Sequence, residues 1–484
     1  MRSRPALKYI VGGLVGAAVP ALMVTGQAFA EEVDPVVALG EATNLLWVVI
    51  GAILVIFMQA GFALVETGFT QKKNAAEVMS MNFAIFGLGF VGFLFVGFPL
   101  AFGGFSYSAF GLAEPMNGDG LPLIGGDTTG LLYWGYDHLG SAATPALLGF
   151  FLYMVAFMDT VATIPTGSMA ERWKWSSFVI WGLFCGAIYY PLFAAWTWGG
   201  GWLAKSWDTM SLGAGYVDFA GSGVVHAVGG VAALAGAIVL GPRIGKFGAD
   251  GKPRAIPGHN IPMAITGCFI LLFGWFGFNA ASTFAATDIQ FSTVAANTAI
   301  AAAVGATVAM FYITKRTGKP DPGMLVNGML AGLVAITAPC AFVSPWAAAV
   351  IGAVAAVIAI EAVFFLERKG IDDPVGAVAV HGICGTFGVI AVGLFANGVY
   401  GAGWNGAVDD AGNGIEIKGL FYGEFGQLGA QLLGVVVIWT VIFGISFAFF
   451  KIQNSLTKGG IRVTEDVEIT GLDIPEMGVA AYND

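Results

Sequence analysis

Charged residues are scarce in this chain. Only 11% of its 484 residues are Asp, Glu, Lys or Arg, whereas 57% are hydrophobic. A soluble domain carries roughly a quarter charged residues, so no soluble core would bury this much apolar sequence. We therefore expect an all-α membrane protein whose solvent is the lipid bilayer. No block of basic residues indicates nucleic-acid binding.

Residues that hold metals or perform covalent chemistry are also few. The four cysteines lie in or beside apolar segments and show neither paired metal spacing nor a disulfide framework. No nucleophile–base pair supports an intramembrane enzyme, and no Lys in an expected span supports a retinal Schiff base. We expect no metal, no cofactor and no catalysis. The 72 glycines instead fit helices that pack closely in lipid.

The first thirty residues are typical of a secretory signal. A basic start precedes an apolar stretch, and Ala28-Phe29-Ala30 forms a cleavage site. The apolar stretch is long, so an uncleaved anchor remains an alternative. Cleavage would place the mature N-terminus outside the cytoplasm.

Apolar segments long enough to span a bilayer, about 20 residues each, recur along the remaining chain. We expect eleven, at 43–69, 80–104, 144–168, 175–198, 217–241, 261–283, 291–314, 322–342, 345–366, 374–397 and 426–452. The predicted division is a signal peptide (1–30), a transmembrane domain (31–454) and a cytoplasmic tail (455–484).

Basic residues set the orientation. With the N-terminus outside, only Lys205 and Lys418 of the 21 Lys and Arg fall in outside loops, and three more lie in the signal. The rest fall in cytoplasmic loops or the tail, as the positive-inside rule requires. We expect a multi-pass protein of a bacterial inner membrane. The outside loops at 105–143 and 398–425 are either vestibule walls or lids.

A short motif occurs twice. Val225-His226 and Val380-His381 each begin a V-H-x-x-x-G sequence in the fifth helix of one half. Five helices per half would invert the second half, and inverted repeats place their site near the midplane. The expected architecture is two inverted five-helix repeats plus a final helix.

His226 and His381 are the two histidines that fall within expected spans. An ionisable residue inside a span is a functional hypothesis by default. The alternative is a packed histidine bonded to a backbone carbonyl. Two neutral imidazoles can share a proton, because one nitrogen donates and the other accepts. Such a pair would provide a hydrogen-bonding site inside an otherwise apolar pore.

Several residues on helices three to six are candidates for contact with a cation. Asp218 begins helix five as an N-cap or as support for a cation at the outer mouth. Trp198, before three glycines, is either an interfacial tryptophan or a cation–π wall, and Phe157 would add a second ring. Phe278 and Ser282 share one face of helix six, either at the pore or in a lipid-facing aromatic belt.

Three further acidic residues fall within expected spans: Glu66, Asp159 and Glu361. Asp159 is the hardest of the three to explain, because an acidic residue inside a span needs a partner and the sequence does not indicate one.

These segments together resemble the ammonium transporter, methylammonium permease and Rhesus family. The resemblance rests on Ala-Glu-Arg at 170–172, Trp-Gly-Gly-Gly at 198–201, Asp-Phe-Ala-Gly at 218–221, Gly-Trp-Phe-Gly-Phe-Asn at 274–279, Val-His-Gly-Ile-Cys-Gly at 380–385, and the tail patterns at 460–463 and 471–473. They follow the family order over nearly the whole mature chain.

The resemblance implies a homotrimer with one pore per subunit, conducting ammonium or ammonia. It also implies roles by position: recruitment of ammonium by Trp198, Ser282, Phe157 and Asp218, and a pore containing His226, His381, Phe278 and Trp275. It further implies a PII-type signal protein as the partner of the tail.

The chain departs from the family pattern at two places. The second of two stacked gate phenylalanines is expected at position 161, which is Val161, and an acidic residue five before His381 is Gly376. Sensor variants of such transporters exist. An ammonium receptor that signals through its tail is therefore the alternative to a transporter.

Overall fold

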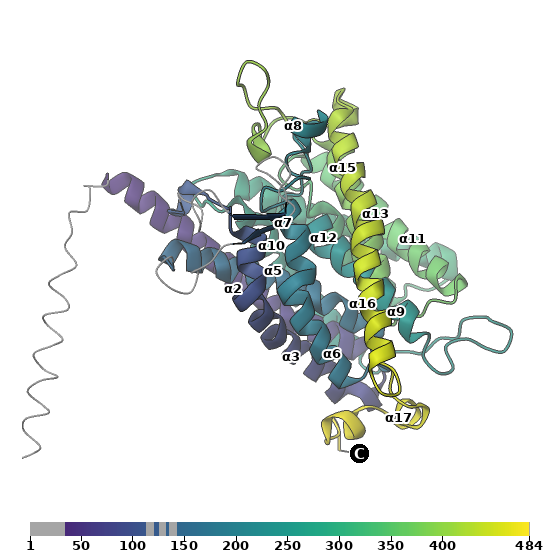
Figure 1. Cartoon of the computed structure of the whole chain (residues 1–484). Coiled ribbons are helices and arrows are strands. Elements are labelled where there is room, and N and C mark those ends of the chain that lie inside the picture. Colours follow the sequence, from purple (N-terminus) through teal and green to yellow (C-terminus); the bar gives the residue numbers. More distant parts are fainter. Residues whose placement is uncertain (1–33, 113–120, 125–131, 135–142, 484) are drawn as a thin grey trace, which may run out of the picture.

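The protein is a bundle of long helices packed around a buried centre (Figure 1). A computed structural model describes residues 34–112, 121–124, 132–134 and 143–483. The predicted signal peptide lies outside these residues. Within them the helices run in two consecutive groups.

The first group comprises α2 (Pro35–Phe69), α3 (Ala75–Gly92), α4 (Phe98–Phe102), α5 (Pro145–Met169), α6 (Trp175–Phe184), α7 (Tyr190–Trp196), α8 (Ser206–Met210) and α9 (Val228–Leu240). The second comprises α10 (Ile261–Asn279), α11 (Gln290–Thr317), α12 (Pro322–Ile336), α13 (Pro345–Arg368), α14 (Cys384–Phe395), α15 (Gly426–Val437), α16 (Phe443–Leu456) and α17 (Glu465–Thr470).

Wider π-helical turns interrupt or begin several of these helices. They are η2 (Phe93–Gly97), η4 (Cys185–Tyr189), η5 (Ser222–Ala227), η7 (Val378–Ile383), η10 (Ile438–Ile442) and η11 (Asp473–Met477). Short 3-10 turns are η1 (Lys72–Asn74), η3 (Ser108–Phe110), η6 (Ala280–Thr283), η8 (Trp404–Gly406) and η9 (Leu420–Tyr422).

The membrane character predicted from composition is confirmed. In the described part of the chain, ten helical segments are long and apolar enough to cross a bilayer, and α12 is a shorter apolar helix of 15 residues. Each falls on one of the eleven predicted segments. The protein is therefore a multi-pass membrane protein. The count of eleven spans stays a prediction, because α12 ends at Ile336 and the chain continues as turns. The inverted repeat also stays a prediction.

One small β-hairpin departs from an otherwise helical fold. Strand β1 (Leu121–Ile124) pairs antiparallel with β2 (Leu132–Trp134), and Leu121 lies opposite Trp134. The hairpin belongs to the loop at 105–143, so it does not alter the helical core.

Helix starts follow a local rule that is readable in the sequence. A residue with a side-chain oxygen caps the first turn, and a proline follows at the first or second helical position, where no N–H is needed. The pairs are Asp34 with Pro35, Thr144 with Pro145, Asn260 with Pro262, Asp321 with Pro322, and Ser344 with Pro345.

Helix α5 lies at the centre of the bundle. In its most apolar stretch 89% of the residues are buried, the largest share among the ten segments. The helix packs against α2, α3 and α9. The segment that joins η5 to α9 is the next most enclosed, at 83%. By contrast α15 and α16 run along the outside of the bundle, where Figure 1 shows them in yellow. Side chains on α5, η5 and α9 are therefore the most remote from lipid and water.

The two glycines of the repeated V-H-x-x-x-G motif allow two helical segments to touch. A Cβ atom on Gly230 would lie 2.1 Å from the backbone nitrogen of Gly382, and one on Gly385 would lie 2.5 Å from the carbonyl oxygen of Ser222. Real Cβ atoms do not approach so closely. The motif therefore brings η7 and α14 against η5 and α9, beside the two histidines.

The residues after α16 fold back onto the loops between helices. Arg462 contacts Glu468 and the carbonyl oxygens of Leu240 and Pro242, and Lys73 donates to the carbonyl oxygens that end α17. Figure 1 shows α17 beside the C-terminus at one end of the bundle. The tail is thus an ordered part of that end.

A buried ion cluster fixes the same end. Arg243 donates two hydrogen bonds, of 2.8 and 3.0 Å, to the carboxylate of Asp372 and also contacts Glu171. Burial alone would raise the pKa of Asp372, but the guanidinium groups of Arg172 and Arg243 hold it well below its usual range. Asp372 therefore stays ionised and stabilises the fold at neutral pH.

We predict that Gly230→Ala destabilises the protein by about 1–3 kcal/mol, because the added methyl group must push two backbones apart. Thermal unfolding in detergent or lipid measures this. Gly87→Ala is the matched control, since Gly87 also lies in a span and nothing lies within 4 Å of its added Cβ. Equal melting temperatures for the two variants would contradict the close approach.

Candidate functional site

The two histidines predicted from the repeated motif meet at the centre of the bundle. His226 lies in η5 and His381 in η7, and their Nδ1 atoms are 3.1 Å apart. This distance requires one Nδ1 to donate and the other to accept. His226 is fully buried and His381 is 5% exposed. The side chains bond to each other, so the alternative of single histidines held by carbonyl groups is wrong.

Aromatic rings enclose His226. Its imidazole stacks on Trp275 at a centroid distance of 5.1 Å and on Phe278 at 5.4 Å. The indole of Trp275 is fixed in turn, because its Nε1 donates to Thr337 at 2.8 Å. Trp275 and Phe278 are fully buried, so the interpretation of Phe278 as part of a lipid-facing belt is also wrong.

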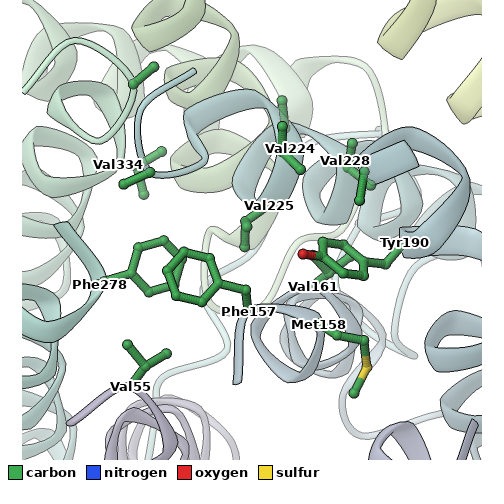
Figure 2. Close-up of a cluster of buried hydrophobic side chains, with 14 of the residues drawn as sticks. Val55, Phe157, Met158, Val161, Tyr190, Val224, Val225, Val228, Phe278 and Val334 are labelled. Atoms are coloured by element: carbon green, nitrogen blue, oxygen red, sulfur yellow. The ribbon is translucent and has the colours of Figure 1, made fainter. Parts of the chain in front are cut away.

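The ring that faces Phe278 is Phe157. The two rings stack with centroids 4.1 Å apart and planes 23° from parallel, and Figure 2 shows them overlapping. The prediction that the second stacked position falls on Val161 is therefore wrong. Val161 is fully buried one helical turn further along α5, and Figure 2 labels it in the same cluster of buried hydrophobic side chains. The chain has both stacked rings after all.

A cavity of about 540 Å³ lies on one side of this stack. We call it the outer cavity, because the orientation predicted from the sequence places it outside. Phe157, Trp198 and Ser282, three of the four predicted recruitment residues, line it together. Parts of both loops that the sequence predicts to lie outside complete the wall, including Tyr107 and Trp404. The described parts of these loops form walls of the cavity. Of the two alternatives for the loops, vestibule walls or lids, this arrangement favours walls.

The fourth predicted recruitment residue supports the cavity from behind. Asp218 is 1% exposed and is absent from the lining. Its carboxylate accepts hydrogen bonds from the backbone N–H groups of Gly221, Gly223 and Val224 at 2.8–2.9 Å. Its carbonyl oxygen accepts one from Nε1 of Trp198 at 2.7 Å. Asp218 thus caps η5 and fixes the Trp198 ring.

Tyr153 is a site residue that the sequence reasoning missed. Its hydroxyl lies 3.0 Å from Oγ of Ser282 and donates to the carbonyl oxygen of Gly277 or Phe278. Its ring also packs on Phe157 at a centroid distance of 4.8 Å. The available signal was the spacing, because residues four apart share one face of a helix.

A second, much smaller cavity of about 20 Å³ lies on the other side of the histidines. We call it the inner cavity, again from the predicted orientation. His381 lines it, together with Phe62, Glu66, Asn327 and apolar residues of α2, α5, α10, α12, η7 and the turn that precedes η7. The volume is enough for a single water-sized molecule.

These contacts define one continuous sequence of neighbours. The outer cavity ends at Phe157, which stacks on Phe278, which stacks on His226. His226 contacts His381, which lines the inner cavity. Among the four side chains of this line the polar atoms are imidazole nitrogens, and surroundings of this kind are more costly for an ion than for a neutral molecule.

Asp159 is a buried acidic residue of α5. Asp159 is 2% exposed, and its Oδ1 atom has no hydrogen-bond partner within the residues that the structure describes. It lies on α5 beside Thr160, whose hydroxyl donates to the carbonyl of Ala156.

Comparisons with known proteins agree on one family. The family model described as Ammonium Transporter Family matches residues 46–482. The chain is 45% identical over 441 residues to ammonium transporter Amt2 of Archaeoglobus fulgidus, covering 91% of this chain and 88% of that protein. It is 34% identical over 460 residues to ammonium transporter 1 member 3 of Solanum lycopersicum, covering 92% and 94%.

Solved structures show the same architecture. A protein described as a sensor Amt protein superposes with a TM-score of 0.76 at 36% identity, covering 91% of this chain and 99% of that one. Candida albicans Mep2 superposes with a TM-score of 0.72 at 27% identity, covering 88% and 87%.

Proposed function

The chain belongs to the ammonium transporter family, and we propose that it carries ammonium nitrogen across a bacterial inner membrane through the path between the two cavities. The observation that carries the proposal is the contact sequence from Phe157 through Phe278 and His226 to His381. It joins an aromatic outer cavity to the inner side by way of two paired imidazoles.

Ammonium is recruited in the outer cavity. The rings of Trp198 and Phe157 attract a cation through their π faces, and their centroids are 5.8 Å apart. Ser282 accepts a hydrogen bond from ammonium, which potassium cannot donate. Asp218 acts through its cap on η5 and its hold on Trp198. Together these contacts select ammonium over an ion of similar size and charge.

The pore then carries ammonia rather than the bare cation. Moving an ion to the bilayer centre costs a few to more than about ten kcal/mol, which favours loss of the proton at the outer side of the ring stack. Ammonia passes Phe157 and Phe278 and exchanges hydrogen bonds with His226 and His381. Whether the proton follows separately decides if transport carries charge.

The assembly and orientation belong to the same proposal. We place the mature N-terminus outside and residues 455–484 in the cytoplasm, where a PII-type signal protein would read the docked tail. The bundle forms a homotrimer with one pore per subunit, built from two inverted five-helix repeats plus a final helix. Residues 1–30 act as the signal peptide.

A second candidate function is an ammonium receptor. Two observations favour it: one structural relative is described as a sensor, and the tail of this chain is tied to the loops by Arg462 and Lys73. In that function, ammonium in the outer cavity changes the docking of the tail without net transport.

Currents in proteoliposomes on a solid-supported membrane separate the two functions. Ammonium and potassium pulses are compared, with internal pH followed in parallel. A sustained current for ammonium alone shows transport with charge, and an internal pH change without current shows electroneutral ammonia flux. Flat traces in both would contradict transport and favour the receptor.

We predict that His226→Ala and His381→Ala impair selective ammonium transport. Each removes one partner of a buried hydrogen bond, which costs about 1–3 kcal/mol, or roughly 5- to 160-fold in flux. The proteoliposome assay measures both flux and the preference over potassium. Unchanged flux and unchanged selectivity in both variants would refute the role of the pair.

We also predict that Phe157→Val lowers the preference for ammonium over potassium by roughly tenfold, because a hydrated gap replaces the ring that shields the dry pore. Val161→Ala is the matched control: it shortens a buried side chain on the same helix, one turn away from the stack. A larger loss of selectivity in the control would restore Val161 as the gate position.

A further inference from the structure

The inner cavity contains a carboxylic acid for which the proposed pathway has no role. Twelve residues line this cavity, and the only polar side chains among them are Glu66, Asn327 and His381. Glu66 is 3% exposed and lies near the end of α2, while Asn327 belongs to α12 and His381 to η7. Three separate helical segments thus present their polar groups to a space that holds one small molecule.

Neutral donors alone satisfy Glu66. Asn82 donates from Nδ2 at 2.7 Å, and the hydroxyl of Thr166 lies 2.8 and 2.9 Å from the two carboxyl oxygens. None of the ion pairs in the described segments includes Glu66. A carboxylate has about four acceptor positions, so these contacts leave capacity for a further donor. An uncompensated charge at this depth is costly, whereas a neutral acid or an ion pair with a small cation is not.

A purely structural role explains the contacts less completely. The hydrogen bonds to Asn82 and Thr166 tie α2 to α3 and α5, but a glutamine oxygen would accept from the same donors. The structural role therefore requires an acceptor and no acid. The position beside His381, in a cavity of water size, is what the structural role leaves unexplained.

We propose that Glu66, together with Asn327, forms an inner ammonium site that turns ammonia leaving His381 back into ammonium. This inference rests on the proposed transport of ammonia through the pore. The protonated carboxyl of Glu66 gives its proton to ammonia: its O–H bond breaks, the fourth N–H bond forms, and the ammonium is paired with the carboxylate. The side-chain oxygen of Asn327 accepts a hydrogen bond from the new cation.

The cycle closes from the cytoplasmic solution. Ammonium leaves the cavity, and a proton from cytoplasmic water restores the acid of Glu66. The net step is ammonia plus one cytoplasmic proton giving ammonium. Ammonia is thereby trapped as an ion at the inner end of the pore, so its return through the dry segment is disfavoured.

Glu66→Gln tests this directly, because it keeps the shape and an acceptor for Asn82 and Thr166 but removes the acid. Two measurements are made on protein in lipid: ammonium flux into proteoliposomes, and the infrared difference spectrum after ammonium chloride replaces potassium chloride. The unchanged protein is expected to lose a protonated-carboxyl band on ammonium addition. The variant is expected to lack that change and to lose about tenfold or more in flux, within the range of a positioned proton donor.

Two further variants control the result. Glu361→Gln removes another carboxyl within a span, one that contacts Arg316 and Tyr312 away from the cavity, and should leave flux and spectrum unchanged. The double variant Glu66→Gln with Asn327→Asp puts a carboxyl back into the same cavity and should recover flux. If Glu66→Gln does not fold, Asn327→Leu tests the opposite wall and should weaken the infrared change.

The outcomes separate this site from the transport proposal. No ammonium flux by the unchanged protein overturns transport and the inner site's role with it. Flux by the unchanged protein and by Glu66→Gln to the same extent, or a carboxyl band that is still lost in Glu66→Gln, overturns the inner site alone. For Asn327→Leu, full flux with an undiminished infrared change has the same meaning.

Discussion

The contact between Nδ1 of His226 and Nδ1 of His381 is the constraint on which the rest of the site depends. The two residues are far apart in sequence, and a 3.1 Å contact requires their helical segments to cross almost without side chains between them. Gly230, Gly382 and Gly385 permit that crossing. Both histidines lie in π-helical turns, which recur at functional sites because they re-aim side chains. The imidazole contact therefore depends on the glycines of the motif, which allow the two segments to approach.

Burial gives this pair its effect. His226 is covered by Trp275 and Phe278, and the stack of Phe157 on Phe278 separates it from the outer cavity. In such a dry segment a hydrogen bond is strong and a charge is expensive. Because a charge is costly in the dry segment, the two ends of that segment need different groups to bind a cation. Aromatic faces and a hydroxyl suit a cation at the outer mouth, whereas the inner end offers the carboxyl of Glu66.

Much of this arrangement could be predicted from the sequence. Apolar length gave the spans, and the placement of proline after a capping residue marks several helix starts. The repeated V-H-x-x-x-G motif identified the histidine pair, and Trp198 and Ser282 line a common cavity, as the family resemblance implied. The spans and the helix starts are local features, so spacing along the chain predicts them, whereas the other two contacts were inferred from the repeat and from the family resemblance.

Features that depend on helix rotation and on contacts between distant segments could not be predicted. Phe157 and Val161 are one turn apart on α5, and only the packing of α10 decides which of them meets Phe278. Tyr153 reaches Ser282 across the same interface. Asp218 has the sequence of a cap and of a cation contact alike, and its burial decides for the cap. No spacing rule relates Glu66 to Asn327 and His381, which come from three parts of the chain.

The measurement that tests the central claim most directly is nitrogen NMR of the protein in lipid, with ¹⁵N-labelled histidine and His226→Ala and His381→Ala spectra for assignment. The account predicts a neutral pair at neutral pH: one Nδ1 protonated, the other not, with a scalar coupling across the hydrogen bond between them. Two imidazoles that both carry a proton on Nδ1, or that show no coupling, would contradict it.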